Sequence, residues 1–162
     1  MDTTDLAGVY RDVIALAEWA TFLDPAEGWP ARYVIAHLAL NDRALMRGLE
    51  DGEVDTTEAL DEDLLRQEDD PLGALRTSSA RLVDFVDTID EDEMKIRVPV
   101  IMVEPPVITI SRRTPVSRLV RLHATVHLPA HLDQLKALVI RPANAPGPSA
   151  LVRAKKRGVF LI

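Results

Sequence analysis

Residues 114–140 read TPVSRLVRLHATVHLPAHLDQLKALVI, and this stretch combines a helix start with an apolar stripe. Thr114 is a favoured N-cap residue and Pro115 a favoured first-turn residue, so we expect a long helix to begin here. Three histidines recur within it at four-residue steps: His123, His127 and His131. Because each step turns an α-helix by about 400°, the three side chains share one face.

Three other stretches carry apolar residues at the three- and four-residue spacing of an amphipathic helix. They cover residues 4–23, 30–49 and 71–89. Pro25 ends the first, because the residue before a proline is pushed out of the helical region. Pro30 and Pro71 stand at favoured first-turn positions of the other two. We therefore predict an all-α fold, an up-and-down bundle of four helices.

Two connections differ from the helices in composition. Residues 50–70 hold eleven acidic residues and one arginine, which predicts a solvated connection with one short helical turn. Residues 96–111 are rich in β-branched residues and interrupted by prolines. Between the third and fourth helices we therefore expect short extended segments around a turn at Pro105 and Pro106.

The chain has 162 residues, enough for one domain and too few for two comfortable ones. We place the bundle at residues 1–141 and expect residues 142–162 to form a basic, then apolar, tail that packs on the body or a partner. The sequence has no cysteine, which excludes chemistry by its own thiolates. It shows no apolar run of membrane-span length and no signal-peptide pattern, so we expect a cytoplasmic protein without a membrane partner.

Charge is divided unevenly along the chain. Residues 1–93 carry a net charge of −17 and residues 94–162 a net charge of +10, which leaves −7 overall. A domain split this way is expected to bring its halves together or to pair them across a homodimer. The acidic balance argues against nucleic-acid binding, and the seven scattered glycines offer no phosphate-binding loop.

The sequence contains only four histidines. The fourth, His37, lies midway along the expected second helix among apolar residues, where an unpartnered polar ring is costly. Histidines at i and i+4 can present two nitrogens to one metal ion, and His37 can reach the same interior. Two interpretations are open: a three-nitrogen metal site, or histidines that lie on the surface or in the core with single hydrogen bonds. Pro129 should kink the fourth helix, which either re-aims His131 toward His37 or only serves packing.

Two short motifs contain these histidines in order. Residues 28–38 read GWPARYVIAHL, and residues 127–134 read HLPAHLDQ. The first resembles the GW-x7-HL motif of the DinB-like superfamily, in particular the N-terminal domain type of mycothiol-dependent maleylpyruvate isomerases. The second is similar to that family's HxxxH motif, which a glutamine follows three residues later. The resemblance runs from the first helix to about residue 141.

The resemblance implies a four-helix bundle, often dimeric, with a divalent ion such as zinc or nickel held by His37, His127 and His131. It also implies a transferase that uses a low-molecular-weight thiol such as mycothiol, with hydrolysis as a second option. Because the chain has no cysteine, any sulfur nucleophile must come from such a cofactor. These thiols carry carboxylates, so Arg112 and Arg113 are candidates to bind an anionic group or else only neutralise the acidic half.

Three further residues lie near the expected ligands. The position of Gln134 favours the later pair of histidines as ligands, which leaves His123 beside the site or on the surface. Tyr33 and Asn41 lie one turn either side of His37, where they can orient its imidazole, touch a substrate, or simply border the core.

The sequence departs from the isomerases in three ways. It has His127 where they carry a glutamate, it places Pro129 inside the ligand motif, and only residues 142–162 follow the fourth helix where they carry a further domain. These departures argue against maleylpyruvate isomerisation and leave the metal site in place. The alternative is a non-catalytic, dimeric helical-bundle protein that serves in interaction or stress response.

Overall fold

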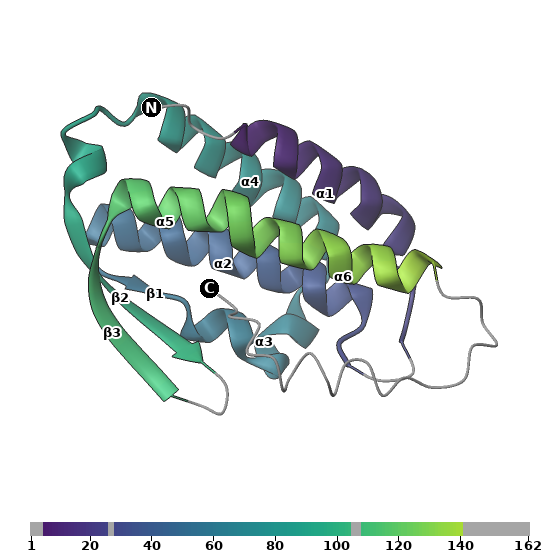
Figure 1. Ribbon diagram of the computed structural model, residues 1–162. Coiled ribbons are helices and arrows are strands. Elements are labelled where there is room, and N and C mark those ends of the chain that lie inside the picture. Colours follow the sequence, from purple (N-terminus) through teal and green to yellow (C-terminus); the bar gives the residue numbers. More distant parts are fainter. Residues whose placement is uncertain (1–4, 26–27, 105–107, 141–162) are drawn as a thin grey trace.

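A computed structural model describes residues 5–25, 28–104 and 108–140 (Figure 1). The described chain is mostly helical with a small three-stranded sheet, so the predicted dominance of helix is confirmed. In chain order the elements are α1 (Leu6–Ala20), α2 (Ala31–Asp51), β1 (Val54–Asp55), η1 (Thr57–Leu60), α3 (Glu62–Gln67), α4 (Pro71–Thr88), η2 (Glu93–Lys95), β2 (Arg97–Glu104), β3 (Ile108–Pro115), α5 (Val116–Leu122), η3 (His123–His127) and α6 (Leu128–Ile140).

Local sequence explains where the long helices begin and end. The Asp5 carboxylate accepts a hydrogen bond from the Gly8 N–H at 2.7 Å and so caps α1. Asp70 caps α4 in the same way, with Pro71 in the first turn as expected. Helix α2 ends at Asp51 and is capped by Gly52, whose φ of 84° is a left-handed conformation that glycine adopts without strain.

The long helices do not alternate in direction, and the up-and-down prediction is wrong at α4. Arg32 donates to the Glu68 carbonyl just ahead of α4, and Ser78, in the middle part of α4, donates to the Asp42 carboxylate. Both pairs are 36 residues apart, so α2 and α4 run in the same direction. Figure 1 shows both helices running from the end where α6 finishes toward the end where the sheet lies.

The acidic connection is the reason for this topology. The predicted short helical turn is confirmed by η1 and α3, but the connection is not only solvated, because β1, η1 and α3 fold against α2 and bury Val54, Ala59 and Leu65 completely. Its acidic side chains face outward, and all except the partly buried Glu68 are exposed. The connection returns the chain along α2, so α4 starts at the same end of the molecule as α2 (Figure 1).

The sheet lies beside the C-terminal half of α2 (Figure 1). β2 pairs antiparallel with β3, and β1 adds in parallel with Val54 opposite Val100. The predicted extended segments are thus confirmed as strands, while the turn at Pro105 and Pro106 falls outside the described residues. β1 comes so close to α2 that a Cβ added at Gly48 would lie 2.4 Å from the Val54 Cα.

The predicted fourth helix is a continuous helical run formed by α5, η3 and α6. It begins at Val116, because Thr114 and Pro115 still belong to β3. The expected N-cap at Thr114 is therefore wrong, and Pro115 takes that position without a side-chain hydrogen bond. Among the described ranges, no helix is long and apolar enough for a membrane crossing. The expected tail at residues 142–162 is not among those ranges.

The run departs from α-helical geometry just before Pro129, in the π-helical turn η3. There the Leu128 N–H bonds to the His123 carbonyl, five residues back. A π turn is wider than an α turn, so the step from His123 to His127 rotates by less than a full circle. The α-helical step from His127 to His131 rotates by more than one. The angular offset of the first step is opposite in sign to that of the second, so the three imidazoles stay on one face of the helical run.

Candidate metal centre

Three histidines from two distant parts of the chain meet in the interior. His37 comes from α2, His127 from the π turn and His131 from α6, and one ring nitrogen of each lies within 4.8 Å of the others. Their side chains are only 3%, 1% and 2% exposed. The structure therefore brings together the three residues that the two motifs single out.

His37 is oriented by the connection that follows α2. Its Nδ1 lies 2.7 Å from the carbonyl oxygen of Ala59 in η1. A carbonyl oxygen only accepts, so Nδ1 carries the hydrogen and donates it. Nε2 then holds the lone pair, and it lies 3.0 Å from His127 Nε2.

His131 is oriented from its own helix. Its Nδ1 lies 2.9 Å from Gln134 Oε1, an acceptor, so Nδ1 again carries the hydrogen. Among the described residues, His131 Nε2 is a buried polar atom without a hydrogen-bond partner. Leaving such an atom unpaired costs about 1–3 kcal/mol, and a bound cation would remove that cost.

All three imidazoles are neutral at pH 7. Burial lowers the pKa of His37 to about 4 and that of His131 to about 3. Burial also lowers the pKa of His127 well below its ordinary value, and repulsion from the neighbouring histidines adds to the effect. Neutral imidazoles have the free lone pair that metal coordination requires.

His123 and Asn41 both lie against His127. His123 Nδ1 is 3.0 Å from His127 Nδ1, and Asn41 Nδ2 is 3.2 Å from that same atom. The sequence places Asn41 one turn from His37, but its amide contacts His123 and His127 of the π turn. His123 is 3% exposed, so of its two expected positions the one beside the ligands is correct.

The remaining expected site residues lie elsewhere. The Tyr33 hydroxyl accepts a hydrogen bond from Arg66 Nε of α3 at 3.1 Å. Arg113 is exposed and donates to the Arg97 carbonyl across the hairpin. The side chain of Arg112 falls outside the described part of the structure.

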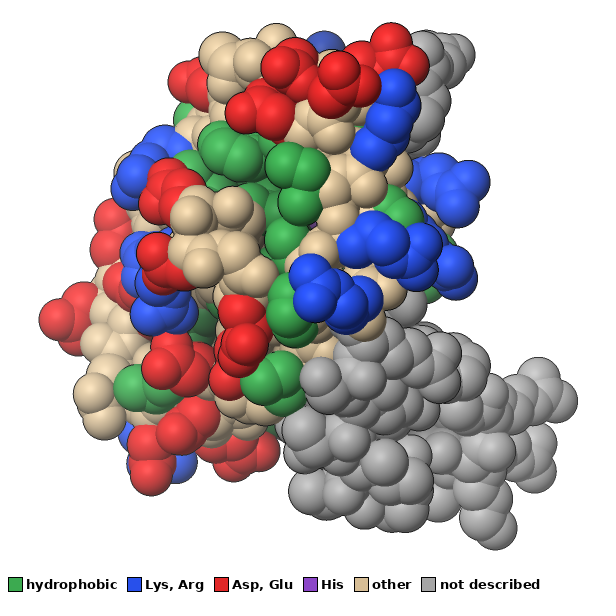
Figure 2. Space-filling model, turned by 90° about the vertical axis from the view of Figure 1, so that its left-hand side faces the viewer, with side chains coloured by type: hydrophobic (Ala, Val, Ile, Leu, Met, Phe, Trp, Pro, Cys, Tyr) green, Lys and Arg blue, Asp and Glu red, His purple; other side chains and the backbone are tan. Residues whose placement is uncertain are grey.

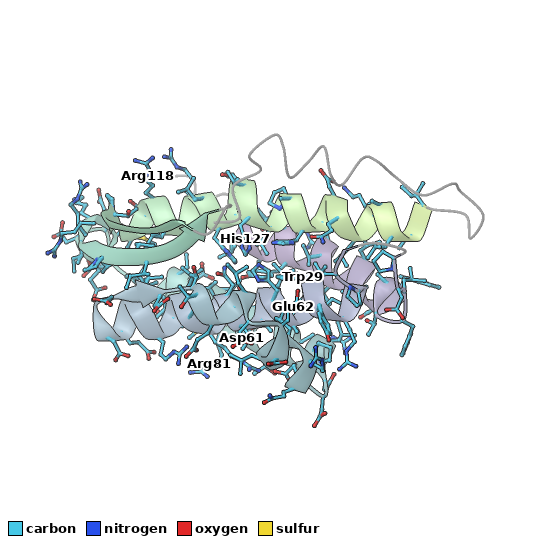
Figure 3. All side chains as sticks on the ribbon, turned by 90° about the horizontal axis from the view of Figure 1, so that it is seen from below. Trp29, Asp61, Glu62, Arg81, Arg118 and His127 are labelled. Carbon is cyan, nitrogen blue, oxygen red and sulfur yellow. The ribbon has the colours of Figure 1, made fainter. Side chains whose placement is uncertain are left out.

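Trp29 and Asp42 also belong to this region, although sequence reasoning gave neither a role. The Trp29 ring lies 5.5 Å from the His37 ring between centroids, and its Nε1 donates to Glu62 at 3.2 Å. Figure 3 shows Trp29 and Glu62 close together near the middle of the molecule, below His127 in that view. Asp42 is fully buried one residue after Asn41. An acidic residue on an apolar helix face was the signal that could have revealed it.

The apolar surface hollow at the other end of α2 is separate from the histidines. It has a volume of about 320 Å³ and is lined by Leu49, Phe85, Ile96 and neighbouring side chains. Figure 2 shows apolar side chains gathered at this end of the molecule between acidic and basic groups. Leu49 follows His37 by twelve residues of α2, about 18 Å along the helix. The hollow is therefore no part of the histidine cluster.

The three histidines could together hold a metal ion. Three neutral imidazoles are a ligand set for zinc, nickel or a similar ion, and three protein ligands leave coordination positions for other groups. A scan against protein-family models and searches of curated proteins and solved structures found no match for the chain.

Proposed function

We propose that this protein binds one divalent transition-metal ion through His37, His127 and His131. The observation that carries the proposal is the pair of buried Nε2 lone pairs on His37 and His131, whose Nδ1 hydrogens are already donated to Ala59 and Gln134. His127 supplies the third nitrogen, and its Nε2 lies 3.0 Å from His37 Nε2. Zinc and nickel are the favoured ions because both suit imidazole ligands.

We further propose a metalloenzyme of the DinB-like four-helix class that transfers a low-molecular-weight thiol such as mycothiol. The family assignment rests on the two sequence motifs, and the need for an external thiol follows from the absence of cysteine. A bound divalent ion supplies Lewis acidity and stabilises a thiolate, or a hydroxide in the hydrolytic variant of the proposal. Ala59 and Gln134 orient two of the imidazoles, and the Trp29 ring covers His37.

Metal content tests the first step. We expect purified, untagged protein reloaded with zinc or nickel to hold about one ion per chain, measured by plasma mass spectrometry. His37→Ala and His131→Ala should lose the ion, because two ligands cannot hold it tightly. Tyr33→Phe is the matched control, since its hydroxyl contacts Arg66, and it should bind like the wild type. A wild type that takes up no ion after reloading would refute the proposal.

A screen of thiols against electrophiles tests the second step. The loaded wild type should form thioether or thioester products from mycothiol or a related thiol, and metal-free protein and His131→Ala should not. Ester hydrolysis without thiol would favour the hydrolytic variant. Loaded protein that is inactive in both assays would favour the alternative, a non-catalytic dimeric protein in which the histidines only bind metal.

A homodimer is part of the proposal. Among the described residues, the ion pairs of Lys or Arg with Asp or Glu seldom join the acidic half, residues 1–93, to the basic half, residues 94–162. Each pair lies within one half, except the pairs that Lys95 makes with its close neighbours in sequence. The opposite charges of the two halves are thus left to meet across an interface with a second copy.

A further inference from the structure

The apolar hollow at the sheet end of the molecule is open to solvent. Its lining comes from the ends of α2 and α4, the segment that leads into β2 and the start of α5. Phe85, Ile89 and Ile96 belong to this lining, and the Ile96 side chain is 54% exposed. Its volume of about 320 Å³ is at the lower end of the range of ligand pockets. The hollow therefore suits the side chains of a short apolar segment.

Acidic side chains flank the hollow on the side of α2 and α4. Residues 50–53, which follow the lining residue Leu49, and residues 84–93 together carry nine exposed acidic side chains and no lysine or arginine. Of these nine, only Glu91 and Asp92 form an ion pair with another described residue, Lys95. Figure 2 shows acidic side chains bordering the apolar ones at this end of the molecule. A segment that joins positive charge to apolar side chains would complement this surface.

The chain contains a segment of this chemistry. Residues 153–157 read RAKKR and residues 159–162 read VFLI, and residues 141–162 hold no aspartate or glutamate. The other stretches outside the described ranges are at most four residues long, and none of them contains a lysine or arginine. The order of the segment, basic and then apolar, matches a hollow whose apolar lining adjoins an acidic flank.

The segment can reach the hollow of its own molecule. The helical run leads away from the hollow, from the lining residue Val116 to Ile140, over about 36 Å. Eighteen residues separate Ile140 from Val159, and they span up to about 60 Å when extended. The connection is therefore long enough for residues 159–162 to return to the hollow.

A competing apolar surface lies at the opposite end of the molecule. Trp19 and Phe22, at the end of α1, are 80% and 90% exposed. Side chains this exposed contact little of the protein, so they form no hollow. The acidic neighbour of Trp19 in sequence, Glu18, is already paired with Arg76. Shape and charge therefore both favour the hollow beside α4 as the site for the segment.

We propose that residues 153–162 bind to this hollow in the same molecule. Residues 159–162 contact Phe85, Ile89 and Ile96, and residues 153–157 lie beside the acidic side chains of residues 84–93. The inference does not rest on the proposed metal function. It leaves exposed arginines of β3 and α5, such as Arg113, to the proposed homodimer interface.

A spin label on the whole chain tests this binding. Because the sequence has no cysteine, Gly158→Cys provides a single attachment point. In nitrogen–proton correlation spectra we expect the label to broaden the amide signals of Ile89 and Ile96 and to leave those of Trp19 and Phe22 sharp. Broadening at Trp19 and Phe22, or broadening at neither place, would overturn the proposal.

A mixed sample shows which molecule supplies the segment. Spin-labelled chains without isotope enrichment are combined with isotope-enriched chains that carry no spin label. Binding within one molecule predicts that the signals of Ile89 and Ile96 stay sharp in this mixture. Broadening there would place the segment on a second copy and would overturn binding within the same molecule.

Substitutions test the apolar contact. Ile96→Glu introduces a charge into the hollow at an exposed position, so the broadening at Ile89 should be lost. Ile140→Glu is the matched control, because this exposed isoleucine lies at the opposite end, and it should leave the broadening unchanged. Phe160→Ser changes only the segment itself and should act like Ile96→Glu. Broadening that persists in Ile96→Glu and Phe160→Ser, with circular dichroism like that of the wild type, would refute the proposal.

Discussion

At the scale of single residues, two imidazoles of the candidate metal centre, those of His37 and His131, donate from Nδ1 to a protein acceptor and keep the lone pair on Nε2. The sequence predicts His37, His127 and His131 as a set, because helical periodicity and the two motifs place them on inward faces. It does not predict their hydrogen-bond partners. The partner of His37 is the backbone carbonyl of Ala59. Because every residue has a backbone carbonyl, and because the composition of this connection indicates a solvated segment, nothing in the sequence marks Ala59 as the partner. Gln134 could be predicted, since it lies three residues from His131 on the same helix.

Removing the Gln134 acceptor should weaken the site. In Gln134→Leu, the buried Nδ1–H of His131 loses its partner at 2.9 Å, so the ring no longer has a preferred tautomer. We expect zinc affinity to fall about 10–100-fold in a chelator competition. Lys136→Gln, an exposed change on the same helix, is the control and should leave affinity unchanged. An unaltered affinity in Gln134→Leu would show that packing alone orients His131.

The lowered histidine pKa values predict that acid destabilises the metal-free protein. Unfolded histidines titrate near pH 6.5, whereas His37 titrates at about 4 when folded. As pH falls between these values, the unfolded state takes up protons that the folded state does not, so the free energy of unfolding decreases. His37 alone accounts for about 3 kcal/mol, and the decrease ends once the folded site is protonated too. Urea unfolding from pH 7 to 4 measures this.

His37→Leu provides the comparison for the pH series. Without that imidazole, the decrease in unfolding free energy between pH 6.5 and 4 should be smaller than in the wild type. An equal decrease in both proteins would contradict the assignment of the acid sensitivity to this cluster.

At the scale of elements, helix boundaries were largely predictable and helix directions were not. Asp70 and Pro71 mark the start of α4 by local chemistry alone, so the sequence suffices there. The spacing of apolar residues shows which face of a helix is buried, but it does not show in which direction the helix runs. The acidic composition of the connection also gave no sign that Val54, Ala59 and Leu65 would pack it against α2. The π turn also escaped prediction, because Pro129 signals an irregularity without specifying whether it is a kink or a wider turn.

The contact between α2 and β1 predicts a sensitive position at Gly48. A Cβ there would lie 2.4 Å from the Val54 Cα and 2.6 Å from the Glu53 carbonyl oxygen, and backbone atoms cannot rotate away. We expect Gly48→Ala to lower the free energy of unfolding by about 1–3 kcal/mol. Chemical denaturation measures it, with the exposed Arg47→Ala as a control that should change stability by less than about 0.5 kcal/mol.

Gly48→Ala should also affect the metal centre. Displacing β1 moves the connection that contains Ala59, whose carbonyl orients His37. Zinc affinity should therefore fall in Gly48→Ala and remain unchanged in Arg47→Ala. A fully stable Gly48→Ala variant would mean that the strand shifts without resistance.

At the scale of the whole molecule, the charge division has a testable consequence for assembly. If the acidic and basic halves meet between two copies, the protein should be a dimer at micromolar concentration in 0.1 M salt. The dimer should weaken in 1 M salt, because screening shortens the Debye length from about 10 Å to about 3 Å. Light scattering coupled to size exclusion measures the mass, and a monomer in low salt would contradict the proposed homodimer.

The burial of the three imidazoles also governs how fast an ion can leave. A chelator cannot reach nitrogens on side chains that are at most 3% exposed, so release must wait for the surrounding elements to open. The exchange rate should then stop rising with chelator concentration and equal the opening rate of the protein. If the contact between Trp29 and Glu62 closes this route, Glu62→Ala, which removes the acceptor of the Trp29 Nε1–H, should exchange faster at the same equilibrium affinity. The rate of ion release would then be set by how often the protein opens and not by how tightly the histidines bind the ion.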